Sequence, residues 1–278
     1  MSEHSHSNHP YHLVEPSKWP AVGALGAFIM MFGLTLFLHP DMLGSGPEAF
    51  LEAIGLWSIA PGVAIVMMTM RGWWSDVIHE ATVQKMHTSI VQIGLRYGMA
   101  LFIASEVMFF AAFFWAFFDA SLFPKEAAGF VWPPEGIEIF EPFDLPLLNT
   151  IILLTSGFTV TWAHHDIRAG NMKHAARMLG ITVGLGLLFT TLQVWEYANA
   201  PFAFTDGIYP TTFFMATGFH GFHVIIGTIF LAVNWARCAK GHFEADHHFG
   251  FEAAAWYWHF VDVVWLFLFS FVYVWSSL

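Results

Sequence analysis

Seven long stretches of the chain contain almost no charged residue, and they dominate its pattern of apolar and polar positions. Each has roughly 18 to 30 residues, and about 20 apolar residues in a helix cross a hydrocarbon core of about 30 Å. Because backbone amides in lipid must form hydrogen bonds within their own segment, each stretch is expected to be a helix. The predicted membrane spans are Ala21–Leu38, Ala53–Met70, Tyr97–Phe118, Leu145–Ala163, Met178–Trp195, Ile208–Ala236 and Ala253–Leu278.

The basic residues indicate how these spans are oriented. Nine of the ten Lys and Arg residues fall on one side of the seven predicted spans, and only Lys125 falls on the other. Basic residues are enriched in loops on the cytoplasmic side of a membrane. We therefore expect the N-terminus on the cytoplasmic or matrix side and the C-terminus on the periplasmic or intermembrane side.

The composition agrees with a membrane protein and argues against other classes. Hydrophobic residues make up 56% of the chain and charged residues 11%, too few to cover a soluble globule. The net charge of −11 comes with no basic cluster, so nothing indicates nucleic-acid binding. The single Cys238 cannot form an internal disulfide. The first 19 residues are polar and resemble neither a secretory signal nor a transit peptide, so we expect insertion where the chain is made, in a bacterium or inside an organelle. Of these two settings, we favour a bacterial inner membrane over a mitochondrial one.

Small residues at four-residue spacing predict where helices approach each other closely. Gly94 with Gly98, and Gly180 with Gly184, follow this pattern. Small side chains allow two backbones in a membrane to come near each other. The pattern therefore predicts helix contacts at both places and indicates no binding or catalytic role.

Ionisable residues in or at the ends of the apolar stretches are the main candidates for function. They are Glu106, Glu196, His220, His223, His259 and Asp262. His220 and His223 are three residues apart, as are His259 and Asp262, so each pair shares a helical face. A charge at the bilayer centre costs about 2.5–3.5 kcal/mol. Glu106 is therefore expected to be neutral, or bound to a lipid headgroup or another side chain.

Three interpretations of these residues remain open. They can form a satisfied hydrogen-bond network that fixes helix packing, or a site for lipid or protons inside the bundle. The third interpretation, metal ligation, finds little support, because His220 and His223 would need further ligands from facing helices. His164–His165 lie at a helix end and His247–His248 in a loop, and adjacent helical side chains diverge by about 100°. We therefore expect no metal site in this chain.

No catalytic motif is present in the sequence. It contains no phosphate-binding Gly-Lys-Ser/Thr loop, no nucleophile elbow and no His-Glu-x-x-His. An independent seven-helix proton channel or transporter, with Glu106 and Asp262 as a relay, is the alternative function that these residues allow. A seven-helix receptor fits less well, because its N-terminus would lie outside, against the distribution of basic residues.

Several longer motifs resemble the subunit III family of cytochrome c oxidases, the haem–copper oxidases. The most specific is the aromatic segment 247–265, which reads HHFGFEAAAWYWHFVDVVW and resembles the family's last helix. Residues 95–99 (LRYGM), 105–107 (SEV), 113–117 (FFWAF), 147–150 (LLNT), 161–165 (TWAHH) and 216–227 (ATGFHGFHVIIG) also match. The resemblance runs from Tyr11 to the end of the chain.

This resemblance implies a fold and a function. Members have seven transmembrane helices, and the first two are separated from the other five by a V-shaped cleft that holds phospholipids. The implied parts are a polar tail over 1–20, a two-helix part over 21–74, a connecting loop over 75–96 and a five-helix bundle over 97–278. Members carry no redox cofactor, and they flank subunit I, which together with subunit II holds haem a, haem a3 and copper. They stabilise the catalytic subunit and support proton uptake in aerobic respiration.

The resemblance also assigns roles to individual residues. Glu106 matches a carboxylate that reacts with carbodiimides and lies near a lipid headgroup. The positions that match headgroup contacts, or supply basic groups for a lipid phosphate, are Trp73, Trp74, Glu80, Thr82, His87, Arg96 and Arg237. Ser75 and His79 stand where the family has arginines, which leaves the identity of the headgroup open.

Overall fold

The computed structural model describes residues 11–12 and 15–278, and this part of the chain is helical. It contains no β-strand, only an isolated bridge between Glu244 and His247. The chain divides into two compact units, residues 1–93 and 94–278, and each is described by itself. Of the polar tail predicted over 1–20, residues 1–10, 13 and 14 lie outside the described part, and the first helix begins at Trp19.

The first unit is built on two packed helices, α1 (Trp19–Leu38) and α3 (Ala60–Thr82). Their connection consists of η1 (Pro40–Leu43), α2 (Ser45–Ile54) and η2 (Gly55–Ile59). Close packing depends on glycine, because a Cβ at Gly62 would collide with the backbone of Met30. The Ser58 hydroxyl of η2 donates a hydrogen bond of 2.9 Å to the Gly33 carbonyl, which ties η2 to α1.

The second predicted span differs from the observed helix. The sequence predicts one apolar helix over Ala53–Met70, but the chain turns at Gly55, where φ is +51°, and α3 begins only at Ala60. A positive φ of this kind is easily adopted by glycine and interrupts a right-handed helix. Helix α3 then continues beyond Met70 to Thr82, so residues 75–82 are helical. Only residues 83–88 separate α3 from α4 (Ser89–Leu122), where the resemblance implied a loop over 75–96.

Six helices among the described residues are long and apolar enough to cross a membrane. They are Trp19–Leu38, Ser89–Leu122, Leu145–Arg168, Met172–Ala198, Ile208–Ala239 and Phe249–Ser277. Helix α3 is not among them, and its second half carries Arg71, Asp76 and Glu80. The structure thus supports a multi-pass helical membrane protein, and the seventh span remains a prediction.

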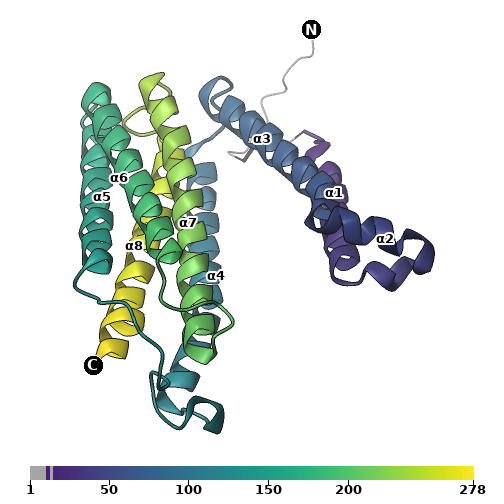
Figure 1. Cartoon of the computed structure of the whole chain (residues 1–278). Helices are drawn as coiled ribbons and strands as arrows, with labels where there is room; N and C mark the ends of the chain where they lie inside the picture. The colour runs from purple at the N-terminus through teal and green to yellow at the C-terminus, as the bar shows by residue number, and fades with distance from the viewer. Residues whose placement is uncertain (1–10, 13–14) are drawn as a thin grey trace. The chain divides into compact units, whose positions relative to one another are not determined.

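The second unit is a bundle of long helices (Figure 1). Its elements are α4 from residue 94 onward, η3 (Glu126–Ala128), α5 (Leu145–Arg168), α6 (Met172–Ala198), α7 (Ile208–Ala239), α8 (Phe249–Leu268), the π-helical turn η4 (Phe269–Val274) and η5 (Trp275–Ser277). Helix α5 packs on α6, α6 on α7, and α8 packs on both α5 and α7.

Two fully buried tryptophans of α8 join it to α5. The Trp258 indole N–H donates to the Ser156 hydroxyl at 2.8 Å, and the Trp265 indole N–H donates to the Thr150 hydroxyl at 2.9 Å. A buried N–H without a partner would cost about 1–3 kcal/mol. The two bonds therefore fix the register of α8 against α5 without leaving a polar group unpaired.

The closest helix approaches in this unit are not all at the predicted glycines. A Cβ at Gly184 would meet no atom within 4 Å, and a Cβ at Gly98 likewise meets none. At Gly180 it would meet the Trp235 indole at 3.2 Å. One of the tightest positions is Gly157, where a Cβ would collide with the carboxylate of Asp262. Four-residue spacing alone therefore does not identify the residues that let these helices approach.

Candidate functional site

Glu106, the single charged residue in the predicted third span, is paired with His223. It lies on α4, and its Oε2 is 2.8 Å from Nε2 of His223 on α7. Nδ1 of His223 donates to the Phe219 carbonyl oxygen at 2.7 Å. The Glu106 side chain is 20% exposed and the His223 side chain 8%. The structure thus brings together two sequence-predicted residues that lie 117 positions apart.

This geometry fixes how many protons the pair holds. Since Nδ1 of His223 already donates to a carbonyl, the short contact between Nε2 and Oε2 requires one further proton between them. The pair is then either an imidazolium with a carboxylate or a neutral imidazole with a carboxylic acid. In both states it is neutral overall, which lowers the cost of placing a carboxyl group within so apolar a helix.

His259 and Asp262 form a second group on α8. The His259 Nδ1 lies 3.5 Å from Oδ2 of Asp262, as expected from their three-residue spacing, and its Nε2 lies 3.1 Å from the Thr161 hydroxyl of α5. The Asp262 side chain is buried, and its Oδ1 has no hydrogen-bond partner among the described residues. This group lies on the packed seam between α5 and α8.

Glu196 belongs to a third group near the end of α6. Its Oε1 accepts hydrogen bonds from the Tyr273 hydroxyl at 2.6 Å and from the Gln193 amide at 3.0 Å. The Asn149 amide donates to the Gln193 carbonyl oxygen at 3.4 Å. No hydrogen bond among the described residues joins this group to Glu106–His223 or to His259–Asp262. The polar residues predicted from the sequence therefore form separate local clusters.

His220, predicted to belong to the same network, stands apart from it. Its ring is buried, and neither ring nitrogen has a hydrogen-bond partner among the described residues. It stacks on the Trp265 ring at a centroid distance of 5.2 Å and meets the Phe189 ring edge-on at 6.0 Å. His220 thus fills space in an aromatic core and makes no contact with Glu106.

The residues that match lipid contacts in the first unit lie on α3 and just after it. Trp73 and Trp74 are exposed by 43% and 59%. Glu80 approaches Nδ1 of His12 at 3.9 Å, and the Thr82 hydroxyl donates to the Ile78 carbonyl within its own helix. His87 follows α3, and its carbonyl accepts a hydrogen bond from the Gln92 side chain at 3.3 Å. 

Both arginines expected to hold a lipid phosphate make contacts inside the second unit. Arg96 forms two hydrogen bonds with Glu252, from Nε to Oε2 at 2.7 Å and from Nη2 to Oε1 at 3.0 Å. Arg237 donates from Nη1 to the Asn234 side chain at 3.2 Å, and its guanidinium lies 4.7 Å from the centre of the Phe243 ring. Because Nε and Nη2 of Arg96 are bound to Glu252, this arginine has one amino group, Nη1, left for a further ligand.

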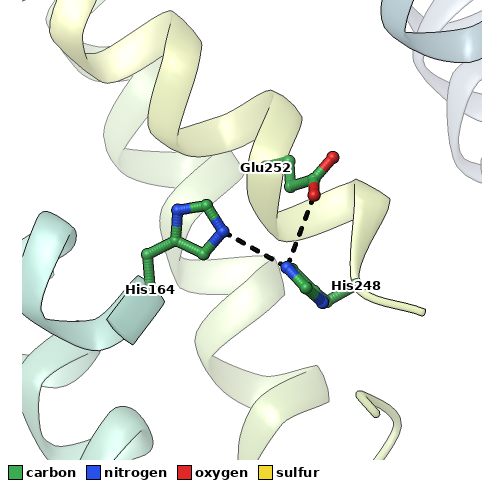
Figure 2. A group of neighbouring side chains, drawn as sticks. All are labelled: His164, His248 and Glu252. Atoms are coloured by element: carbon green, nitrogen blue, oxygen red, sulfur yellow. Dashed lines mark hydrogen bonds and ion pairs between the residues drawn. The ribbon is translucent and has the colours of Figure 1, made fainter. Parts of the chain in front are cut away.

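The Glu252 carboxylate that binds Arg96 belongs to a cluster with His164 and His248, and Figure 2 draws these three clustered residues. His164 comes from the last turns of α5, His248 precedes α8, and Glu252 lies in its first turn. The His248 Nε2 lies 3.2 Å from Nε2 of His164 and 3.4 Å from Oε1 of Glu252. These three ligand atoms all lie within 4.8 Å of one another, a spacing that could hold a metal ion.

Sequence reasoning missed this cluster. It treated His164 and His248 as isolated members of adjacent histidine pairs, and it considered Glu252 only within the aromatic motif. The four-residue spacing of His248 and Glu252 at the start of a helix was a usable signal, because such residues lie on one face. His164 is 84 residues away from His248, and only the packing of α5 against α8 brings it there.

Within the described part of the chain, six helices able to cross a membrane, with ionisable side chains paired inside the bundle, define a polytopic helical membrane protein. The family model for cytochrome c oxidase subunit III matches residues 9–277. Cytochrome c oxidase subunit 3 of Sus scrofa and that of Scyliorhinus canicula are each 54% identical over 273 residues, which covers 98% of this chain and 100% of each relative. The Danio rerio protein of the same name is 53% identical over the same coverage.

This chain therefore belongs to the cytochrome c oxidase subunit III family. As a member, it is a membrane subunit of an oxidoreductase complex and associates with other oxidase subunits. The resemblance described from the aromatic motifs is confirmed along nearly the whole chain.

Proposed function

We propose that this chain is a non-redox accessory subunit that stabilises the catalytic subunit, holds phospholipids and supports proton uptake. Within a chain of this family, the observation that carries the proposal is the Glu106–His223 pair. It holds one exchangeable proton at the contact of α4 with α7, with 20% of the Glu106 side chain exposed.

The proposed setting is a complex in which subunit I is the principal partner and subunit II lies nearby. Haem a, haem a3 and copper belong to those partners, and this chain carries phospholipids and no redox cofactor. We propose seven spans with the first two separated from the other five by a lipid-filled cleft. The N-terminus then lies on the cytoplasmic or matrix side, and we favour a bacterial inner membrane.

Phospholipid binding is supported by the exposed aromatic surface of α3. Trp73 and Trp74 carry indole rings, which prefer the membrane interface. We propose that they contact the headgroup region together with Glu80, Thr82 and His87. Arg96 and Arg237 contribute from the second unit. Since Arg96 keeps 37% of its side chain exposed while bound to Glu252, its free amino group can reach one phosphate oxygen.

Removal of the chain from the purified complex tests this function. We expect the initial rate of electron transfer to remain measurable, because the redox centres lie in partners, while the number of turnovers before inactivation falls several-fold. Oxygen consumption under continuous turnover, with and without this chain, measures both quantities. Equal catalytic lifetimes would contradict the supporting role, and haem or copper retained by the removed chain would contradict the assignment of all redox centres to partners.

A further inference from the structure

The geometry of His164, His248 and Glu252 points to a binding site for one divalent transition-metal ion, and we propose zinc as the ion that fits best. Two imidazole nitrogens and one carboxylate oxygen are ligands that zinc prefers. This proposal departs from the sequence-based expectation that the chain has no metal site. It concerns a structural or regulatory ion at the ends of α5 and α8, and it assigns no redox centre to the chain.

The protonation state of His248 is the first argument. Its Nδ1 lies 3.1 Å from the Glu244 carbonyl oxygen, to which it donates, so a neutral His248 presents the lone pair of Nε2 to the cluster. A hydrogen bond from the second ring nitrogen to a carbonyl is the usual support for a metal-binding histidine. In Figure 2 both dashed lines end on this Nε2, one from His164 and one from Glu252.

When His248 is neutral, these contacts place its Nε2 lone pair next to a Glu252 oxygen, and a cation between the two atoms would remove their repulsion. His164 can donate a proton to Nε2 of His248, but the Glu252 oxygen at 3.4 Å then faces the same lone pair with no hydrogen between them. Two acceptors at this distance repel each other unless a proton on His248 or a metal ion lies between them, and the zinc experiments below separate these two cases. A metal ion satisfies all three ligand atoms at once.

The distances agree with tetrahedral coordination. Zinc–nitrogen bonds of about 2.0–2.1 Å at a tetrahedral angle place two ligand atoms about 3.3–3.4 Å apart. The observed separations from His248 Nε2 are 3.2 Å to His164 and 3.4 Å to Glu252. His248 is buried, whereas His164 and Glu252 are half-buried. An ion can therefore reach the cluster, and water can take the fourth position.

Arg96 would act as a support for the carboxylate and not as a competitor for the site. Its two hydrogen bonds hold both oxygens of Glu252, and they leave a second lone pair of Oε1 free to face His248. Hydrogen-bond partners of this kind orient metal ligands, and their loss commonly weakens metal affinity about 10- to 100-fold. The guanidinium also keeps Glu252 ionised, which a metal ligand requires.

Zinc content of the purified complex tests the site. After treatment with a chelator, the complex is dialysed against zinc chloride, and bound zinc per chain is measured by mass spectrometry. We expect wild type to bind one zinc more than His164→Gln and His248→Gln. The matched controls are His165→Gln and His247→Gln, since these exposed neighbours lie outside the cluster and should keep the zinc. Equal zinc in wild type and in the ligand variants would overturn the proposal, as would equal loss in the controls.

A second measurement needs no variant and so does not depend on assembly. Diethylpyrocarbonate modifies free imidazole, and peptide mass spectrometry locates the modified residues. Zinc chloride should slow modification of His164 at least tenfold while leaving exposed His165 unchanged. An unchanged ratio of the two rates with and without zinc would mean that the cluster is held by protons alone, and the metal site would be refuted.

Discussion

Ionisable side chains in this bundle have partners of specific kinds, and the partner decides what each can do. Glu106 shares a proton with His223, whereas Glu196 accepts two hydrogen bonds from Tyr273 and Gln193. The spacing of His259 and Asp262 on one helix indicated their proximity from sequence. The contact of Glu106 with His223 depends on how α4 meets α7, so no local pattern could reveal it.

Replacement of Glu106 by Gln tests the paired carboxyl. We expect the chain to assemble and the haem spectrum of the complex to stay unchanged, because the Gln amide can donate to Nε2 of a neutral His223. Labelling of this chain by a hydrophobic carbodiimide should be abolished, since the reagent needs a carboxyl group. Mass spectrometry of labelled peptides measures this, with Glu126→Gln on the exposed segment η3 as the control that should label normally. A collapsed haem spectrum in Glu106→Gln would contradict the assignment.

At the scale of helices, contacts between particular side chains set which segments pack and where each begins. The apolar run Ala53–Met70 predicted one helix, but the backbone at Gly55 divides it, and α3 begins five residues later and extends further. In the second unit, α8 is held against α5 by indole hydrogen bonds and by the close approach of Gly157 to Asp262. Glycine spacing did not identify this approach, because only one glycine takes part in it.

Two glycine substitutions separate close packing from helix propensity. A methyl group at Gly157 would collide with the buried Asp262 carboxylate, so Gly157→Ala should destabilise the chain by about 1–3 kcal/mol. Gly184→Ala adds the same group to a helix where no atom lies within 4 Å, and it should be neutral or slightly stabilising. The temperature at which half of the tagged chain aggregates in mild detergent measures both. Similar shifts for the two variants would show that α5 and α8 do not approach at Gly157.

At the scale of the whole molecule, the number of membrane spans decides where the two ends of the chain lie. Over residues 11–12 and 15–278, six helices meet the length and composition expected of a span, and α3 is long enough but carries charges in its second half. Nine of the ten basic residues fall on one side only if α3 also crosses. The basic residues thus favour seven spans, while the apolar content of α3 leaves the seventh to be tested.

Cysteine labelling distinguishes seven spans from six. The one native cysteine, buried Cys238, is replaced by Ser, and single cysteines are placed at the exposed positions Ser17 and Ser277. With seven spans, a membrane-impermeant maleimide should label them from opposite sides of sealed vesicles. Labelling from the same side would mean that α3 does not cross.

The controls for this labelling flank a single helix. Cysteines at Lys125 and Lys173 lie before and after α5, one of the six helices that meet the criteria, so they should react from opposite sides in either case. A matching side for these two positions would show that the vesicles leak or are mixed in orientation.

The sequence by itself determined the class of the protein, its family and most of its helices. Long uncharged runs leave the backbone no alternative to helix in lipid, and the aromatic segment 247–265 is specific enough to indicate the family. These properties depend on residues that are neighbours along the chain, and periodicity and composition record them directly.

The tertiary structure decided which polar groups meet. Packing of α4 on α7 joins Glu106 to His223, and packing of α5 on α8 brings His164 to His248 and Glu252, whereas His220 is left among aromatic rings. Such contacts between side chains depend on the rotation and register of one helix against another. Those are set by side-chain packing over many residues, and a local pattern along a single helix does not specify them.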